Sequence, residues 1–396
     1  MKSIQFKDME SLEKEIQINS VDGIEYFITV SFQKQTENQE DLVNRAYQVV
    51  YEYMNQNHIE IFHERVFGSV SCFDKHNKIR KDSVRKFFNE EVPFSYIGAP
   101  PIWGEGIAGV IIHGIHLKNS GGRLTNVAYE GQICGRLYES STDRRLMLNA
   151  IYCDEYEKKS SEQVYATFQK IDRILRTFGF QYKEVLRTWI YIPEILDYYA
   201  AFNKARNQFF EEWNILPRLD EINDFERIFM PASTGVGCEN PYSNVAFFDV
   251  YAISKSVRGS ELKIYNETGS EQRSAYRYGS AFSRSIIVSA QQAQYLFLSG
   301  TASIDAQGET IHVGNIYNQI HETFNVISTL IQDANMDMQC WMEGVVFFKN
   351  PAYVQEYLDA IKQNERAALP VILCVADICR DDLLFEIDGV FAKKGE

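Results

Sequence analysis

The feature that most constrains this fold is an order of predicted elements that occurs twice in the chain. The first copy consists of a helix, a strand, a helix and a strand, at residues 162–178, 186–192, 195–213 and 245–253. The second copy follows residue 272, at residues 315–332, 342–348, 351–365 and 383–392. Placing Phe168 over Phe324 also places Trp189 over Val345. A repeat of this kind determines the architecture and predicts an internally duplicated α+β fold.

The duplication predicts two tandem αβ domains, residues 1–256 and 272–396, each with a mixed sheet packed on helices. The first of them is predicted to carry added strands and loops. The chain has 396 residues, which suits two domains. Residues 257–271 are mostly polar and are predicted to link the two. Residues 93–109 are dense in Gly and Pro around aromatic side chains, and they predict an irregular loop.

The last predicted strand, residues 383–392, carries two carboxylates. With alternating side chains, Glu386 and Asp388 share one face about 7 Å apart, between apolar neighbours. If that face is buried, desolvation and the like charge raise a carboxyl pKa. A carboxyl with such a raised pKa can act as a general acid near neutral pH. The same pattern also fits an edge strand whose carboxylates face water.

The two copies differ at this acid. The first copy ends in VAFFDVYA where the second has FEIDGVFA, which places Ala246 opposite Glu386. We therefore predict that the first domain has no acid of its own, and that the chain has one chemical site.

Composition limits the partners. A net charge of −14 argues against nucleic-acid binding but allows a small anionic substrate held by a few arginines. No apolar run is long enough to span a membrane, and charges occupy the N-terminal segment where a signal peptide is apolar. Seven scattered cysteines without a CxxC motif are typical of a reduced, cytoplasmic protein. The spacing of His113, His116 and Cys134 matches no common zinc motif, so no metal site is predicted.

Several arginines are candidates for binding an anion. Arg187 interrupts the apolar run LRTWIYI, where a charge needs a partner or a ligand. Three further candidates are Arg206, Arg284 and Arg380. Each of them also fits an ordinary surface ion pair.

The segments LFLSGTASID, NQIHETFNVISTLIQDANM, VVFFKNP and LLFEID resemble a YjgF/enamine-deaminase domain. That resemblance implies small αβ units that assemble as homotrimers with pockets between subunits. The segments SYIGAPP, RTWIYIP, PASTGVG, SAYRYGSAFSR and ADICRDDLLFEID resemble one branch, the chorismatases. Chorismatases cleave the enolpyruvyl ether of chorismate. The resemblance implies a cofactor-free enzyme that releases pyruvate together with a hydroxybenzoate or a dihydroxycyclohexadienoate.

The resemblance also implies roles for individual residues. Glu386 matches the catalytic glutamate, and Tyr276 resembles a tyrosine that borders the substrate ring. Cys379 lies where a cysteine accompanies the hydroxybenzoate-forming subtype. Gly300 is expected to make a close backbone contact beside the site.

Two other functions remain open at this stage. The second interpretation is an imine or enamine deaminase of the same fold. Such deaminases clamp a substrate carboxylate with an arginine about fifteen residues before the acid. Residues 369–372 here are LPVI, so this interpretation lacks its clamp. The third interpretation is a non-catalytic protein of this fold that binds a small ligand.

Overall fold

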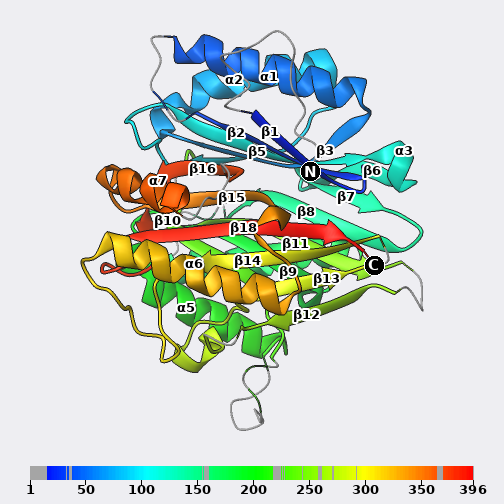
Figure 1. Cartoon of the computed structure of the whole chain (residues 1–396). Coiled ribbons are helices and arrows are strands. Elements are labelled where there is room, and N and C mark those ends of the chain that lie inside the picture. The colour runs from blue at the N-terminus through cyan, green and yellow to red at the C-terminus, as the bar shows by residue number, and fades with distance from the viewer. Residues whose placement is uncertain are drawn as a thin grey trace.

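The computed structural model describes residues 16–32, 34, 38–153, 155, 160–216, 224, 226, 228–242, 244–256, 261–269, 272–290, 292–363 and 369–395. Within these residues the chain forms three mixed β-sheets and pairs of long helices (Figure 1). None of the helices in this part of the chain is long and apolar enough to cross a membrane.

The first sheet has the strand order β1-β2-β5-β3-β4. Its elements are β1 (Ile16–Val21), β2 (Glu25–Ser31), α1 (Gln39–Gln56), β3 (Ile59–Gly68), α2 (Phe73–Phe87), β4 (Ser95–Gly98) and β5 (Ile107–His116), followed by the short α3 (Leu117–Ser120). Helices α1 and α2 lie on its outer face, at the top of Figure 1. The segment 93–109, predicted to be irregular, contains β4, which pairs in parallel with β3.

The second sheet has the order β17-β10-β9-β11-β8-β7-β6. Its elements from this part of the chain are β6 (Arg123–Tyr129), β7 (Gln132–Glu139), β8 (Asp143–Ile151), α4 (Ser160–Thr177), β9 (Val185–Tyr191), α5 (Ile195–Glu212), β10 (Ala232–Gly237) and β11 (Phe247–Lys255).

The third sheet has the order β12-β13-β14-β18-β15-β16. The remaining elements are β12 (Lys263–Glu267), β13 (Ser285–Ser289), β14 (Ala293–Thr301), α6 (Ile316–Asp333), β15 (Trp341–Phe348), α7 (Val354–Gln363), β16 (Val371–Val375), β17 (Asp377–Ile378) and β18 (Phe385–Lys394). Strand β12 lies within the predicted linker 257–271, of which residues 257–260, 270 and 271 lie outside the described residues.

The sequence shows why the helices form where they do. The side chain of Asn315 accepts a hydrogen bond from the backbone N–H of Asn318 (3.0 Å) and so caps the start of α6. Phe324 and Leu330 belong to its apolar stripe, which packs on the third sheet. Helices α4 and α6 lie within two residues of their predicted bounds.

All three sheets contain the same five-strand order. In the first it is β1-β2-β5-β3-β4, in the second β7-β8-β11-β9-β10, and in the third β13-β14-β18-β15-β16. The predicted α+β class and the internal repetition are confirmed. The part of the chain predicted as one domain with added strands, residues 1–256, contains two of these repeats.

The three repeats are joined in a ring by the chain that follows β4, β10 and β16. Glu239, after β10, bridges Gly98 of β4, and Pro101, after β4, bridges Cys374 of β16. Strand β17, after β16, pairs with β10. The first repeat therefore extends a backbone segment to the third, the third to the second, and the second to the first.

Equivalent side chains from the repeats meet at the centre of the ring. Glu25, Arg145 and Tyr295 occupy the same register position on β2, β8 and β14. Arg145 Nη1 lies 2.6 Å from Glu25 Oε1, and the Tyr295 hydroxyl donates to the same oxygen at 2.6 Å. This contact of three equivalent positions is what a threefold arrangement of repeats requires.

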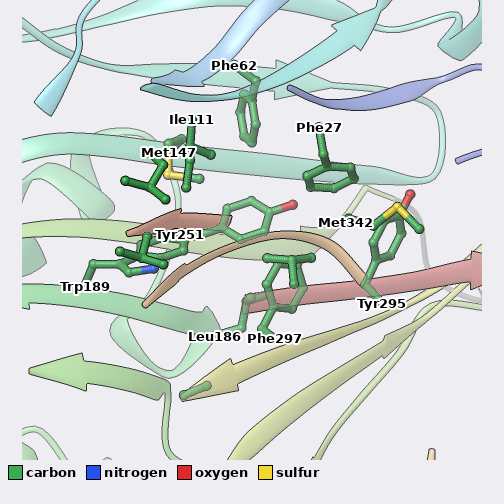
Figure 2. Close-up of a cluster of buried hydrophobic side chains, with 14 of the residues drawn as sticks. Phe27, Phe62, Ile111, Met147, Leu186, Trp189, Tyr251, Tyr295, Phe297 and Met342 are labelled. Carbon is green, nitrogen blue, oxygen red and sulfur yellow. The ribbon is translucent and has the colours of Figure 1, made fainter. Parts of the chain in front are cut away.

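The core lies where the inner faces of the sheets meet. Figure 2 shows Phe62 of the first sheet, Tyr251 of the second and Phe297 of the third pointing toward one another. The ring centroids of Phe62 and Tyr251 are 5.7 Å apart, and those of Tyr251 and Phe297 are 5.5 Å apart. Burial of these large rings holds the repeats together.

Strand register corrects one alignment made from the sequence. Phe247 pairs with Tyr191 in the second repeat, as Glu386 pairs with Phe347 in the third. The residue at the position of Glu386 is therefore Phe247, not Ala246, because the sequence comparison was offset by one residue.

Candidate active site

Glu386 and Asp388 are buried on β18, with 4% and 1% of their surfaces exposed. Strand β18 lies between β14 and β15, so the interpretation as a solvent-facing edge strand is wrong. Burial, together with the negative charge of Asp388, raises the pKa of Glu386 to about 8, while Arg187 acts in the opposite direction. At neutral pH most of the Glu386 carboxyl therefore carries its proton.

Asp388 is held by two residues of the neighbouring repeat. Arg187 Nη2 donates to Asp388 Oδ2 at 2.9 Å, and the Thr234 hydroxyl donates to the same oxygen at 2.8 Å. The guanidinium of Arg187 also lies over the ring of Trp189, 4.6 Å from its centroid. Arg187 is therefore the counter-charge of Asp388 and does not line the cavity beside Glu386.

A cavity lies beside the Glu386 carboxyl, between the second and third repeats. It is lined by Ile190, Tyr199, Phe202, Arg206, Ser233, Gly235, Tyr278, Ser280, Phe282, Arg284, Gly300, Ala302, Ile304, Cys379, Arg380 and Glu386. Six of the eight residues proposed from the sequence belong to this wall: Glu386, Cys379, Arg206, Arg284, Arg380 and Gly300.

Three arginines of this wall have no carboxylate partner among the described residues. Arg206 and Arg284 are 4% and 5% exposed, and burial lowers the pKa of Arg206. Arg206 Nε and Arg284 Nη2 are buried without a hydrogen-bond acceptor in that part of the chain. Arg380 lies over the ring of Tyr278, 5.6 Å from its centroid. Two buried cations and a half-buried one without carboxylate partners favour an anionic ligand.

The tyrosine proposed from the sequence is not in the wall. Tyr276 packs with the apolar core of the second repeat, and Tyr278 faces the cavity instead. The two residues flank Arg277 in one short 3₁₀ turn, Ala275–Tyr278, and nothing in the sequence distinguishes their directions.

Two of the wall residues that were not proposed from the sequence have a spacing that offers a signal. Tyr199 and Phe202 precede Arg206 on α5 by seven and four residues. Residues at these spacings share one face of a helix, so a helix that directs Arg206 at a ligand also directs these rings there.

Cys379 lies in the wall as a neutral thiol. Burial, followed by the charge of Glu386, raises the pKa of Cys379 to about 12, although Arg380 opposes the shift. At neutral pH this group can donate a weak hydrogen bond but is not a thiolate nucleophile.

A larger cavity, of about 730 Å³, lies between the first and second repeats. The cavity beside Glu386 is about 40 Å³. The smaller one is the candidate active site, because it alone of the two is lined by a buried carboxyl whose raised pKa suits proton donation. Among the described residues no cluster of His, Cys, Asp and Glu could hold a metal ion.

No protein-family model matches this chain. A 3-hydroxybenzoate synthase from Streptomyces hygroscopicus is 27% identical over 257 residues, which are 58% of this chain and 69% of that protein. A chorismatase from the same organism is 25% identical over 57% of this chain and 66% of its own length.

Among solved structures, a crystal structure of a chorismatase matches with a TM-score of 0.59 at 16% identity. The match covers 95% of this chain and 99% of the other, which shows a shared fold. The resemblance to chorismatases that the sequence motifs indicated is confirmed.

Proposed function

We propose that this chain, whose relatives carry the names 3-hydroxybenzoate synthase and chorismatase, is an enzyme that cleaves chorismate and releases pyruvate. The observation that carries the proposal is a buried, protonated Glu386 in a cavity wall with three arginines that lack carboxylate partners in the described chain.

The reaction begins with proton transfer to carbon. Glu386 gives its proton to the terminal methylene of the enolpyruvyl group, and the ether carbon becomes an oxocarbenium-like centre. When water attacks this centre, the resulting hemiketal breaks between its central carbon and the ether oxygen, so pyruvate leaves and the oxygen stays on the ring as a hydroxyl. In the route without water, the bond between the ether oxygen and the ring breaks to release pyruvate, and the neighbouring ring hydroxyl attacks the ring carbon. Loss of a ring proton then gives the hydroxybenzoate, and Glu386 regains its proton in either route. Proton transfer to carbon is slow, so an acid whose pKa lies near the working pH lowers the main barrier.

Chorismate carries two carboxylates, and the wall offers matching charges. Guanidinium groups bind carboxylates through paired N–H donors. Arg206 and Arg284 each have an unused buried N–H for such a contact. Because the cavity is about 40 Å³, side chains such as Tyr278 and Arg380 must move to admit a ring.

We further propose a hydroxybenzoate as the ring product. Cys379 lies in the wall, at the place that accompanies this subtype in the resemblance. Conversion of chorismate to pyruvate and hydroxybenzoate consumes no water overall, whereas the dihydroxycyclohexadienoate retains one. The mass of the product therefore distinguishes the two.

The direct test adds chorismate to the purified chain and couples pyruvate to lactate dehydrogenase, with chromatography of the ring product. Pyruvate together with an equimolar hydroxybenzoate supports both parts of the proposal. Pyruvate with a dihydroxycyclohexadienoate overturns the product assignment, and no pyruvate overturns the function. Ammonia from an imino acid would instead support the deaminase.

We expect kcat/KM for pyruvate release to fall as the pH rises. Glu386 reacts as the acid and its pKa is about 8, so kcat/KM is expected to be highest below that value. Above it, kcat/KM should fall about tenfold per pH unit. In Asp388→Asn the like charge is gone, so this fall should begin at a lower pH. A profile that rises through pH 8, or one that Asp388→Asn leaves in place, contradicts this role for Glu386.

Gly300 leaves the space that the Glu386 carboxyl occupies. A Cβ at Gly300 would lie 2.0 Å from Glu386 Oε1, so Gly300→Ala should turn the carboxyl away. Pyruvate release is expected to fall about 10²-fold, the effect of a misplaced catalytic group. The control is Gly235→Ala, because a Cβ at Gly235 meets nothing within 4 Å in the same cavity. Equal rates in the two variants would refute this explanation of Gly300.

A further inference from the structure

The cavity between the first and second repeats lies at the same position in the ring as the active site. Gly135 pairs with Leu148 as Ser285 pairs with Leu298, so the neighbouring Cys134 corresponds to Arg284. By the same registers, Ala150 corresponds to Gly300 and Phe247 to Glu386. Cys134 and Ala150 line this cavity, as their counterparts line the active site.

The buried aspartates next to the two cavities, and the residues that hold them, are also at equivalent positions. Asp249 matches Asp388 in strand register. Asp249 accepts one hydrogen bond from the Ser95 hydroxyl, which is at the position of Thr234. Its Oδ2 lies 2.9 Å from Nε2 of His63, which is at the position of Arg187. The first interface thus keeps the buried support of the active site but has a phenylalanine in place of the acid. The buried acid of the active site therefore has no counterpart in strand register at this interface.

Aromatic side chains make this cavity suitable for a flat ring. Phe73, Phe94, Tyr152 and Tyr242 line it, and the rings of Tyr152 and Tyr242 are stacked with centroids 5.2 Å apart. At about 730 Å³ it has room for a small molecule.

Polar groups lie at two parts of the cavity wall. Asn149, 4% exposed, lines it with an Oδ1 that has no donor among the described residues. Its Nδ2 donates to Ser95 Oγ at 3.3 Å, which leaves the oxygen to accept a bond from a ligand. Lys81 and Arg85, one turn apart on α2, line the cavity as exposed cations, and Arg85 Nη1 lies 3.9 Å from Asp82 Oδ1. Lys81 has no carboxylate partner in the described part of the chain.

We propose that this cavity is a second, non-catalytic site that binds a planar aromatic carboxylate carrying a hydroxyl group. The ring lies against the aromatic wall, the hydroxyl donates to Asn149 Oδ1, and the carboxylate lies near Lys81 and Arg85. Binding here requires no turnover, so the proposal stands or fails independently of chorismate cleavage.

The test is calorimetric titration of the full chain with 3-hydroxybenzoate. We expect two sites per chain in the unchanged protein. Ile133 lines the second cavity and is 37% exposed, so a larger side chain there fills the cavity without disturbing the core. Ile133→Trp should therefore remove one of the two binding sites. Arg206→Met should weaken the other site and leave the second one unchanged.

Two comparisons test the assigned contacts. Lys81→Glu should weaken the second site at least threefold, whereas Lys78→Glu, an exposed lysine of the same helix outside the cavity wall, should not. Benzoate, which lacks the hydroxyl, should bind there about tenfold more weakly.

Binding of 3-hydroxybenzoate that Ile133→Trp leaves unchanged, whether at one site or at two, would overturn the proposal. Equal effects of Lys81→Glu and Lys78→Glu would overturn the position given to the carboxylate. Failure of the pyruvate assay alone would remove the proposed function and leave this result intact.

Discussion

Replacement of Glu386 by glutamine is expected to lower pyruvate release from chorismate by about 10²–10⁴-fold, the usual contribution of a positioned general acid. Glutamine keeps the shape of the side chain and removes the transferable proton. The effect should be on kcat, with KM little changed, because the proton is transferred in the transition state. Steady-state rates with the coupled assay measure both constants.

The matched control for this substitution is Glu343→Gln. Glu343 is also a buried carboxyl, 2% exposed, and burial raises its pKa. Glu343 lies on β15, and its Oε1 is 3.2 Å from Nη2 of Arg65. Glu343 does not line the cavity beside Glu386. We expect this variant to lose stability in thermal unfolding but to keep kcat. If both variants lose kcat equally, or if Glu386→Gln stays within threefold of the unchanged protein, Glu386 is not the acid.

Replacement of either Arg206 or Arg284 by methionine is expected to lower kcat/KM for chorismate by about 10²-fold. Methionine fills similar space but cannot bind a carboxylate, and loss of one partner of a buried charge pair costs about 2–5 kcal/mol. KM should rise in both variants. Titration calorimetry with chorismate and Glu386→Gln as the parent separates binding from turnover.

Arg277→Met provides the comparison for these arginines. Arg277 lies in the same segment of chain, but its Nε pairs with Glu226 Oε1 at 2.7 Å and 40% of its side chain is exposed. Exposed pairs contribute little, so its kcat/KM should stay within about threefold. A comparable loss in Arg277→Met would mean that the effect is a general one of charge and not of carboxylate binding.

The sequence was sufficient for the parts of the site that depend on strand alternation. The direction of Glu386 follows from a period of two, and the neighbouring strands then determine its burial. The repeated order of helices and strands likewise indicated α6 and β18, because their apolar periodicities are long and regular.

The other features of the site depend on contacts between residues far apart in the chain, and these could not be predicted from the sequence. A buried Arg187 needs an anionic partner, but the sequence could not tell whether that partner is a substrate or Asp388, which lies 201 residues away. The first repeat was assigned to added strands because its own elements bear little sequence likeness to the other two. Its equivalence is visible only in strand order and in the contacts of Glu25 with Arg145 and Tyr295.

The ring formed by the three repeats also determines how the candidate active site responds to dilution. In an assembly of separate subunits, an interface pocket is lost when falling protein concentration favours dissociation. In this protein the backbone bridges at β4 and β16 and the pairing of β17 with β10 lie within one polypeptide. The chain itself therefore fixes the effective concentration at which the repeats meet. The homotrimer suggested by the family resemblance remains a prediction, but the cavity beside Glu386 needs no second molecule to form its described wall. Specific activity should therefore stay constant down to enzyme concentrations at which mass action would separate weakly bound subunits.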